Sequence, residues 1–179
     1  MKRLIETPSP QNLLAVTLAG LSFTIAFAYV FGLIHRAMAP FTIVDLEFAW
    51  TPARLAEMTT AWGAAGDAAA RQSLWVDYLF MPVYVALAAG LVLITARASA
   101  GGWRTAGLWL TLAPFGAWAC DALENAMLLT SLPPAAPAPW ALTVAGLAAA
   151  VKFGLLAVGL IYFAAALVRL GLARLAPKA

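Results

Sequence analysis

The sequence predicts an all-α integral membrane protein, built as a bundle of four transmembrane helices with a helical segment outside the membrane. Of its 179 residues, 64% are hydrophobic and 11% are charged, whereas soluble domains carry about 25% charged residues. The apolar residues also form long blocks, and four of these reach the length of about 20 residues that crosses about 30 Å of hydrocarbon. No internal repeat is visible, so we expect a single domain over 1–179.

The four predicted spans cover roughly 12–34, 74–96, 103–132 and 140–170. The apolar part of the first span exceeds the roughly 7 to 15 residues of a signal-peptide core, and no clear small-residue cleavage site closes it, which favours a retained helix. The last two blocks are longer than a bilayer requires, so we expect them to tilt or to project beyond it.

The orientation follows from basic residues near the ends of the spans. They gather before the first span, between the second and third, and after the fourth, as Lys2, Arg3, Arg97, Arg104, Arg169, Arg174 and Lys178. With four spans these places share one side, which the positive-inside rule assigns to the cytoplasm. We therefore predict that both termini are cytoplasmic, in a membrane of the bacterial inner-membrane type.

The connection between the first two spans, 36–73, has the pattern of a helical outer segment. In TPARLAEMTTAWG, Thr51 is placed to cap a short helix, Pro52 suits its first position, and Gly63 follows its end. The apolar side chains of this helix share one face, at Leu55, Met58 and Trp62. We expect the helix to lie on the membrane surface or to cap the bundle.

Prolines and glycines mark the remaining connections and contacts. The stretch SLPPAAPAPW is expected to end the third span and start the fourth, because proline does not continue a helix. Pro82 and Pro114 are expected to bend their spans for the same reason. Small residues let helices approach closely, and the fourth span offers three glycines, Gly146, Gly154 and Gly159.

The segment CDALENAMLL places charged residues inside an apolar block. Asp121, Glu124 and Asn125 are separated by three and four positions, so they share one face of a helix, while Asp77 lies in the second span and Lys152 in the fourth. A charged side chain at mid-bilayer costs about 2.5 to 3.5 kcal/mol and therefore faces the bundle interior. A rise of about 1.5 Å per residue places the four charged residues in the outer half of the bilayer. We predict one polar cluster that opens toward the outer face.

Within this cluster we assign candidate roles. The candidate catalytic residues are Asp121 and Glu124, which would bind or transfer protons, and Lys152, which would balance charge or hold an anionic group. The candidate ligand-binding residues are Asp77, Asn125, His35, Arg36, Tyr84 and Trp118. Of these, His35 and Arg36 end the first span and would form the rim. The structural alternative is a salt-bridge network that joins the third and fourth spans.

The predicted charges do not balance, because three carboxyl groups face one lysine. Either one or two of these carboxyls are protonated, or something cationic completes the site. Arg36, Arg54 or Arg71 could supply that charge, and so could a metal ion or a cationic ligand. The sequence identifies no cofactor and no metal site, because one cysteine and one histidine offer no ligand spacing.

Three segments carry a resemblance to known proteins. WGAAGD at 62–67, DYLFMPVY at 77–84 and DALEN at 121–125 together resemble a pattern in small four-helix bacterial membrane proteins of unknown function. The resemblance covers most of 45–129. The resemblance points to the polar residues of these segments, which the residue pattern also singles out. It implies no activity, cofactor or partner.

Three classes of function fit the sequence. The one we favour is a binding protein or enzyme for a lipid-like small molecule, with the polar cluster as its site. The second is an accessory subunit of a larger membrane complex, and the third is a proton- or ion-coupled transporter. Beyond the bilayer itself, a homodimer or a partner membrane subunit fits the pattern. A nucleic-acid partner does not, because no basic cluster with interleaved aromatic residues occurs.

Overall fold

A computed structural model describes residues 2–133 and 137–175, and helices form nearly all of this part of the chain. No β-strand occurs in these two ranges. The elements in order are α1 (Lys2–Glu6), α2 (Pro10–Ile34), the 3-10 helix η1 (His35–Met38), α3 (Ile43–Glu47), α4 (Pro52–Ala98), α5 (Gly101–Leu110), α6 (Ala113–Ser131) and α7 (Pro139–Leu175). The predicted all-α class is therefore confirmed. Lys178, which entered the orientation prediction, lies outside the described residues.

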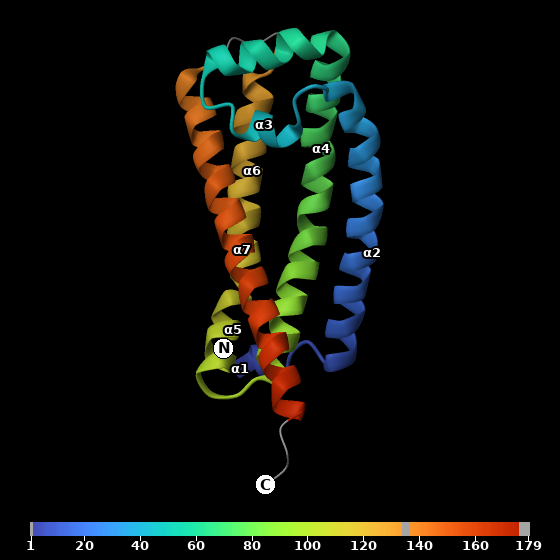
Figure 1. The fold of residues 1–179 in the computed structure, drawn as a ribbon, viewed down its shortest axis with the longest axis vertical. Coiled ribbons are helices and arrows are strands. Elements are labelled where there is room, and N and C mark those ends of the chain that lie inside the picture. The colour runs from blue at the N-terminus through green and yellow to red at the C-terminus, as the bar shows by residue number, and fades with distance from the viewer. Residues whose placement is uncertain (1, 134–136, 176–179) are drawn as a thin grey trace.

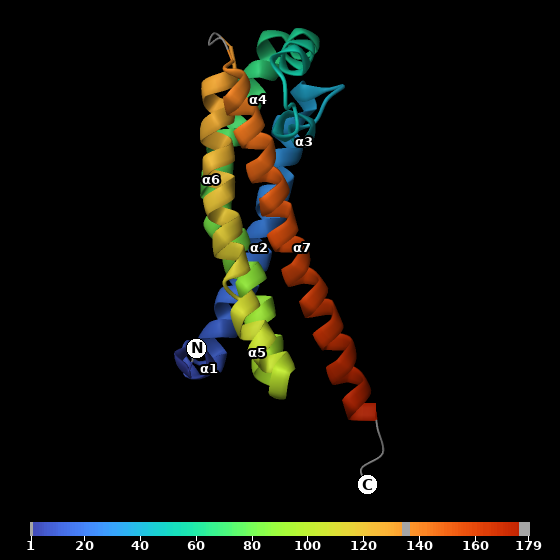
Figure 2. The same cartoon turned by 90° about the vertical axis from the view of Figure 1, so that its left-hand side faces the viewer.

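The helices α2, α4, α6 and α7 lie along the length of the molecule (Figure 1). The most extensive contacts are those of α6 with α7 and of α2 with α4, and α4 also packs against α6 and α7. The helix α5 precedes α6 at the end that also holds α1 and the last turns of α7 (Figures 1 and 2). At the opposite end, α3 and the first turns of α4 cover the helices.

Within the described residues, three helical segments are long and apolar enough to cross a membrane, namely Pro10–Met38, Pro52–Ala98 and Pro139–Leu175. This composition and length support an integral membrane protein. The block 103–132 was predicted to be one continuous span. In the structure it is divided between two helices, because α5 ends at Leu110 and α6 begins at Ala113. Pro114 lies in the first turn of α6. Proline lacks the N–H that would continue α5, whereas the first turn of a helix needs no such donor.

The helix α4 contains a sharp change of direction at Gly63. Thr51 caps its start, with its side chain accepting a hydrogen bond from the backbone N–H of Arg54, and Pro52 occupies the first turn. Gly63 has a φ of 59°, a left-handed conformation that glycine adopts without steric cost. The predicted caps of a short helix are thus present, although the chain then continues as helix to Ala98. Pro82 does not interrupt this second part.

The largest hydrophobic core lies at the end covered by α3. Leu46 of α3, Leu55 and Met58 of α4, Leu128 of α6 and Leu142 of α7 are almost completely buried in it. Farther along α2 and α7, many large apolar side chains are exposed. A soluble protein rarely exposes so many, so this distribution also supports contact with lipid.

The closest approach of α2 to α4 occurs at glycines outside the fourth predicted span, whereas Gly159 of that span faces α4, where a Cβ would lie 3.7 Å from Val92. A Cβ atom at Gly20 would lie 2.9 Å from the backbone nitrogen of Leu87, and one at Gly90 would collide with the side chain of Thr17. These contacts bring α2 against α4. In the fourth predicted span, Gly146 lies against the ring of Trp50, but a Cβ at Gly154 would meet no atom within 4 Å.

Candidate functional site

The ammonium group of Lys152 lies among three carboxylates. Its nitrogen is 2.8 Å from Glu124 Oε2, 2.9 Å from Asp121 Oδ1 and 3.3 Å from Glu47 Oε1. The residues Lys152, Asp121 and Glu124 are 5%, 2% and 0% exposed, so this network is screened from solvent. Asp121 and Glu124 point toward α7 because a separation of three positions puts both on one face of α6. The structure therefore brings together the three candidate catalytic residues.

Glu47 was not among the predicted site residues. It lies in α3, which the Thr42 and Asp45 side chains hold at its start: the Thr42 N–H donates to Asp45 Oδ2 over 2.7 Å, and the Asp45 N–H donates to Thr42 Oγ1 over 3.2 Å. Leu46 and Glu47 of this helix are buried. Burial raises the pKa of the Glu47 carboxyl above its ordinary value, although the nearby Lys152 acts in the opposite direction. The T-x-x-D capping pattern was the available sequence signal for α3.

Asp77 and Asn125 connect α4 to α6 beside this network. The Asn125 side-chain amide donates to Asp77 Oδ2 over 2.8 Å and to the carbonyl oxygen of Leu74 over 3.3 Å. The Tyr78 hydroxyl donates to the Ala122 carbonyl over 3.1 Å. Asn125 follows Glu124 directly in α6. The hydrogen bond between Asn125 and Asp77 therefore continues the polar network from Lys152 of α7 through α6 to α4. We call Glu47, Asp77, Asp121, Glu124, Asn125 and Lys152 the polar cluster.

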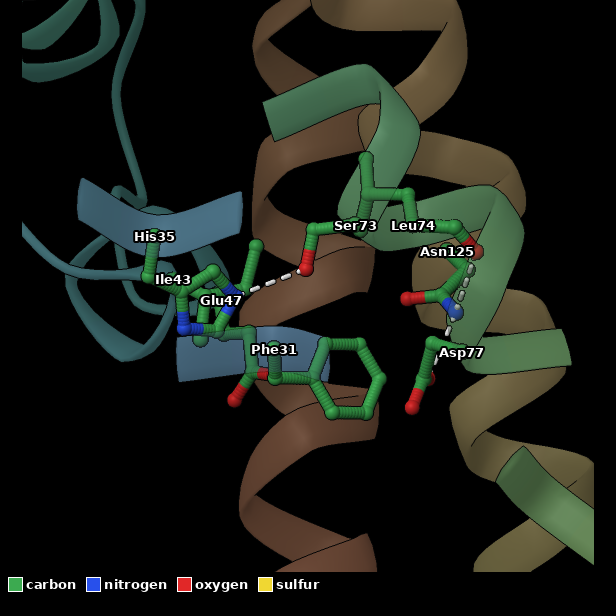
Figure 3. A pocket seen from close by; sticks show the side chains of 8 residues that line it. All are labelled: Phe31, His35, Ile43, Glu47, Ser73, Leu74, Asp77 and Asn125. Carbon is green, nitrogen blue, oxygen red and sulfur yellow. Dashed lines mark hydrogen bonds between the residues drawn. The ribbon is translucent and has the colours of Figure 1, made fainter. Parts of the chain in front are cut away.

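A cavity of about 130 Å³ borders the polar cluster (Figure 3). It is lined by Phe31, His35, Ile43, Glu47, Ser73, Leu74, Asp77 and Asn125. Asp121, Glu124 and Lys152 do not line it. Glu47, Asp77 and Asn125 therefore border the cavity. The other three residues of the cluster are closed off from it.

His35 belongs to the wall of this cavity. Its Nε2 atom lies 2.8 Å from the Ser73 hydroxyl oxygen, and its ring stacks on Phe31 with 5.6 Å between ring centres. Ser73 is 2% exposed, so this hydrogen bond satisfies a buried hydroxyl. The rim position predicted for His35 corresponds to this wall, with Phe31 as an unpredicted aromatic neighbour.

Three other predicted ligand-binding residues lie elsewhere. Arg36 is exposed and does not line the cavity. Trp118 is 41% exposed and is not part of the wall either. Tyr84 lines a separate cavity of about 230 Å³, whose other walls are apolar and come from α4, α6 and α7, while its hydroxyl group lies near Asp121 of the polar cluster.

The arginines that were expected to complete the charge balance have other contacts. Arg54 pairs with Glu57 over 2.6 Å. Arg71 donates to the carbonyl oxygens of Leu132 and Pro133 over 3.3 and 2.6 Å, which satisfies the end of α6. Within the described ranges, no group of three or more histidine, cysteine, aspartate or glutamate side chains has the geometry to hold a metal ion. The ammonium of Lys152 fills the space that its three carboxylates share.

No protein-family model, curated protein or solved structure matches this chain. The resemblance of the DYLFMPVY and DALEN segments to small bacterial membrane proteins therefore stays a prediction. The case for a function rests on the cavity and on the polar cluster beside it.

Proposed function

We propose that the chain crosses a bacterial inner membrane four times, through α2, the part of α4 after Gly63, α5 together with α6, and α7. In this arrangement η1, α3 and the first turns of α4 lie at the outer face. Two observations support it. The helices α5 and α6 together run beside the three long apolar helices (Figure 1), and α1 and the last turns of α7 lie at one end of the molecule. The basic residues Arg97 and Arg104 belong to the same end, as the positive-inside rule requires of a cytoplasmic face.

We further propose that the protein binds a lipid-like small molecule in the cavity at His35, Glu47 and Asp77. The observation that carries this proposal is an open volume of about 130 Å³ directly beside buried charges. An engineered cavity of about 150 Å³ holds benzene, so this one has the size for a head group rather than for a whole lipid. The rest of such a ligand would lie in the surrounding bilayer.

An unsatisfied oxygen atom of the cavity wall supports a ligand at this position. Glu47 lines the cavity, and its Oε2 atom is buried and has no hydrogen-bond partner among the described residues. A buried carboxylate oxygen without a partner is costly in a low-dielectric interior, and a ligand in the cavity would supply the missing donor. Buried charges in membrane proteins mark ligand or ion sites by default.

Native mass spectrometry of the protein, released gently from its own membrane, tests the proposal. We expect a discrete additional mass on the wild-type protein. The substitution Ile43→Trp fills the cavity from a partly buried position of its wall and should remove that mass. Val44→Trp is the matched control, because Val44 is 48% exposed and does not line the cavity. An additional mass that survives Ile43→Trp would contradict binding at this site.

The closed part of the polar cluster favours a second candidate function. Asp121, Glu124 and Lys152 pair directly and do not line the cavity, which suits a clasp that holds the bundle of an accessory subunit together. In that case the same mass spectra would show a larger assembly with other chains. Ile43→Trp would then leave the assembly intact.

A further inference from the structure

The polar cluster contains more carboxyl groups than basic groups. Glu47, Asp121 and Glu124 surround Lys152, and Asp77 is held beside them by Asn125. Four carboxyl groups thus share one ammonium. The cluster carries an excess of negative charge whenever more than one of these carboxyls is ionised.

No other cation of the described residues reaches this cluster. Arg54 and Arg71 are engaged with Glu57 and with the end of α6, and Arg36 does not line the cavity. His35 binds the Ser73 hydroxyl and forms no ion pair with a described carboxylate. On the side of the cavity, no cation of the described residues pairs with Asp77 or with Glu47 Oε2.

The cavity wall combines this charge with an aromatic surface. Glu47 and Asp77 both line it, and Glu47 is a buried residue with one unpartnered oxygen, Oε2. The Phe31 ring lines the same cavity (Figure 3). Carboxylates together with an aromatic ring recognise organic ammonium groups, because the ring face attracts a cation that the carboxylates neutralise.

We propose that the cavity receives an organic ammonium group, either a primary amine or a quaternary ammonium, as the head group of an amphiphile. This inference rests on the proposed ligand-binding function and names the chemistry of the ligand. An anionic head group does not fit, because it would lie against Asp77 and Glu47 with Lys152 enclosed by its own carboxylates.

Soluble head-group probes test the inference directly. The full chain is reconstituted in nanodiscs of phosphatidylglycerol, a lipid whose head group has no amine, and titrated with choline, ethanolamine and the uncharged carbon isostere of choline. The readout is saturable thermal stabilisation. We expect choline or ethanolamine to bind about tenfold or more tightly than the isostere, because shape alone does not attract an uncharged group to the carboxylates. The tighter of the two cations distinguishes a quaternary from a primary ammonium.

Two variants locate the binding. Asp77→Asn should weaken the affinity for the preferred cation about tenfold, since it removes one charge of the cavity wall. Glu57→Gln is the matched control, because Glu57 is an exposed carboxylate paired with Arg54 and lies outside the cavity. If Asp77→Asn does not fold, Phe31→Leu removes the aromatic face without changing the charge and should weaken the affinity in the same direction.

The outcomes separate this inference from the function on which it rests. Equal affinity for choline, ethanolamine and the isostere, or no binding of either cation, would overturn the ammonium assignment. A co-purified lipid without an ammonium group would overturn it too, while the proposed lipid binding would stand. Selective binding of a cation by a protein that carries no lipid would support the inference and contradict the lipid-like nature of the ligand.

Discussion

Glu47 Oε1 lies 3.3 Å from the ammonium nitrogen of Lys152, although the two residues are 105 positions apart in the sequence. This contact joins the five-residue helix α3 to α7. Such a short helix has little stability of its own. Its position therefore depends on the contact with Lys152 and on the burial of Leu46, and through Glu47 it forms part of the cavity wall.

Removal of the Lys152 ammonium should show how much the ion pairs of the polar cluster contribute to the free energy of unfolding. Lys152→Met leaves three buried carboxyl groups without their cation and should lower the free energy of unfolding by about 3 to 5 kcal/mol. Adding Asp121→Asn should recover part of this loss, because one stranded carboxylate is then absent. Thermal unfolding in one detergent measures Lys152→Met, Asp121→Asn and the double variant.

The control for this cycle lies on the same helix. Arg169→Met also removes one positive charge from α7, but Arg169 is exposed, and its guanidinium lies 5.3 Å from the centre of the Trp103 ring. Arg169→Met should lower the free energy of unfolding by about 1 kcal/mol or less. Strictly additive losses for Lys152→Met and Asp121→Asn would mean that the two side chains do not interact.

The pairing of Asp121, Glu124 and Lys152 could be predicted because it depends on regular geometry. Offsets along a helix and depth in a span are properties of the sequence once the helices are assigned. Glu47 could not be assigned in this way, since it lies outside the predicted spans and its burial is a result of how α3 folds back. Similarly, Tyr84 and Trp118 lie on predicted helices, but which face of each helix meets the cavity depends on packing.

The interruption between α5 and α6 was missed for a related reason. The stretch 105–119, which spans the junction, carries no charged residue, so hydropathy does not reveal where α5 ends. Pro114 was expected to bend one helix, whereas in the structure it belongs to the first turn of a new one. Pro82 has the same chemistry and stays inside α4. The outcome at each proline depends on whether neighbouring packing supports the helix on both sides.

The start of α3 should depend on pH through Asp45. Hydrogen bonds from Thr42 hold the pKa of the Asp45 carboxyl below its ordinary value, so the folded protein favours the charged form. This stabilisation is complete above the ordinary aspartate pKa, and it is lost as the pH falls through the lowered one. Asp45 is half-buried at the surface, so solvent screens its charge in part, and we expect Asp45→Asn to lower the free energy of unfolding by only about 0.5 kcal/mol at neutral pH.

Melting temperatures at two pH values check this expectation. The wild type should exceed Asp45→Asn at neutral pH, and the difference should close below a pH of about 4. A difference that persists in acid would show that the charge of Asp45 is not its cause.

The proposed topology can be tested by labelling single cysteines. In a Cys120→Ala background, Ala56→Cys lies on an exposed position of α4 before Gly63, and Gly102→Cys lies at the start of α5. With the proposed orientation, a membrane-impermeant maleimide should label Ala56→Cys in intact spheroplasts and Gly102→Cys only after permeabilisation. Labelling of both positions from outside would contradict the proposal that the part of α4 after Gly63 crosses the membrane.

Two helical glycines form a matched pair for testing the contact between α2 and α4. A Cβ at Gly90 would collide with the Thr17 side chain, whose hydroxyl already donates to the Leu13 carbonyl over 2.7 Å, so the neighbour has little freedom to move. Gly90→Ala should therefore lower the free energy of unfolding by about 1 to 3 kcal/mol. Gly154→Ala meets no atom within 4 Å. It should leave stability unchanged or raise it by up to about 1 kcal/mol, because alanine favours the helix. Thermal unfolding of the two variants side by side measures the difference, and equal stability would mean that α2 does not approach α4 at Gly90.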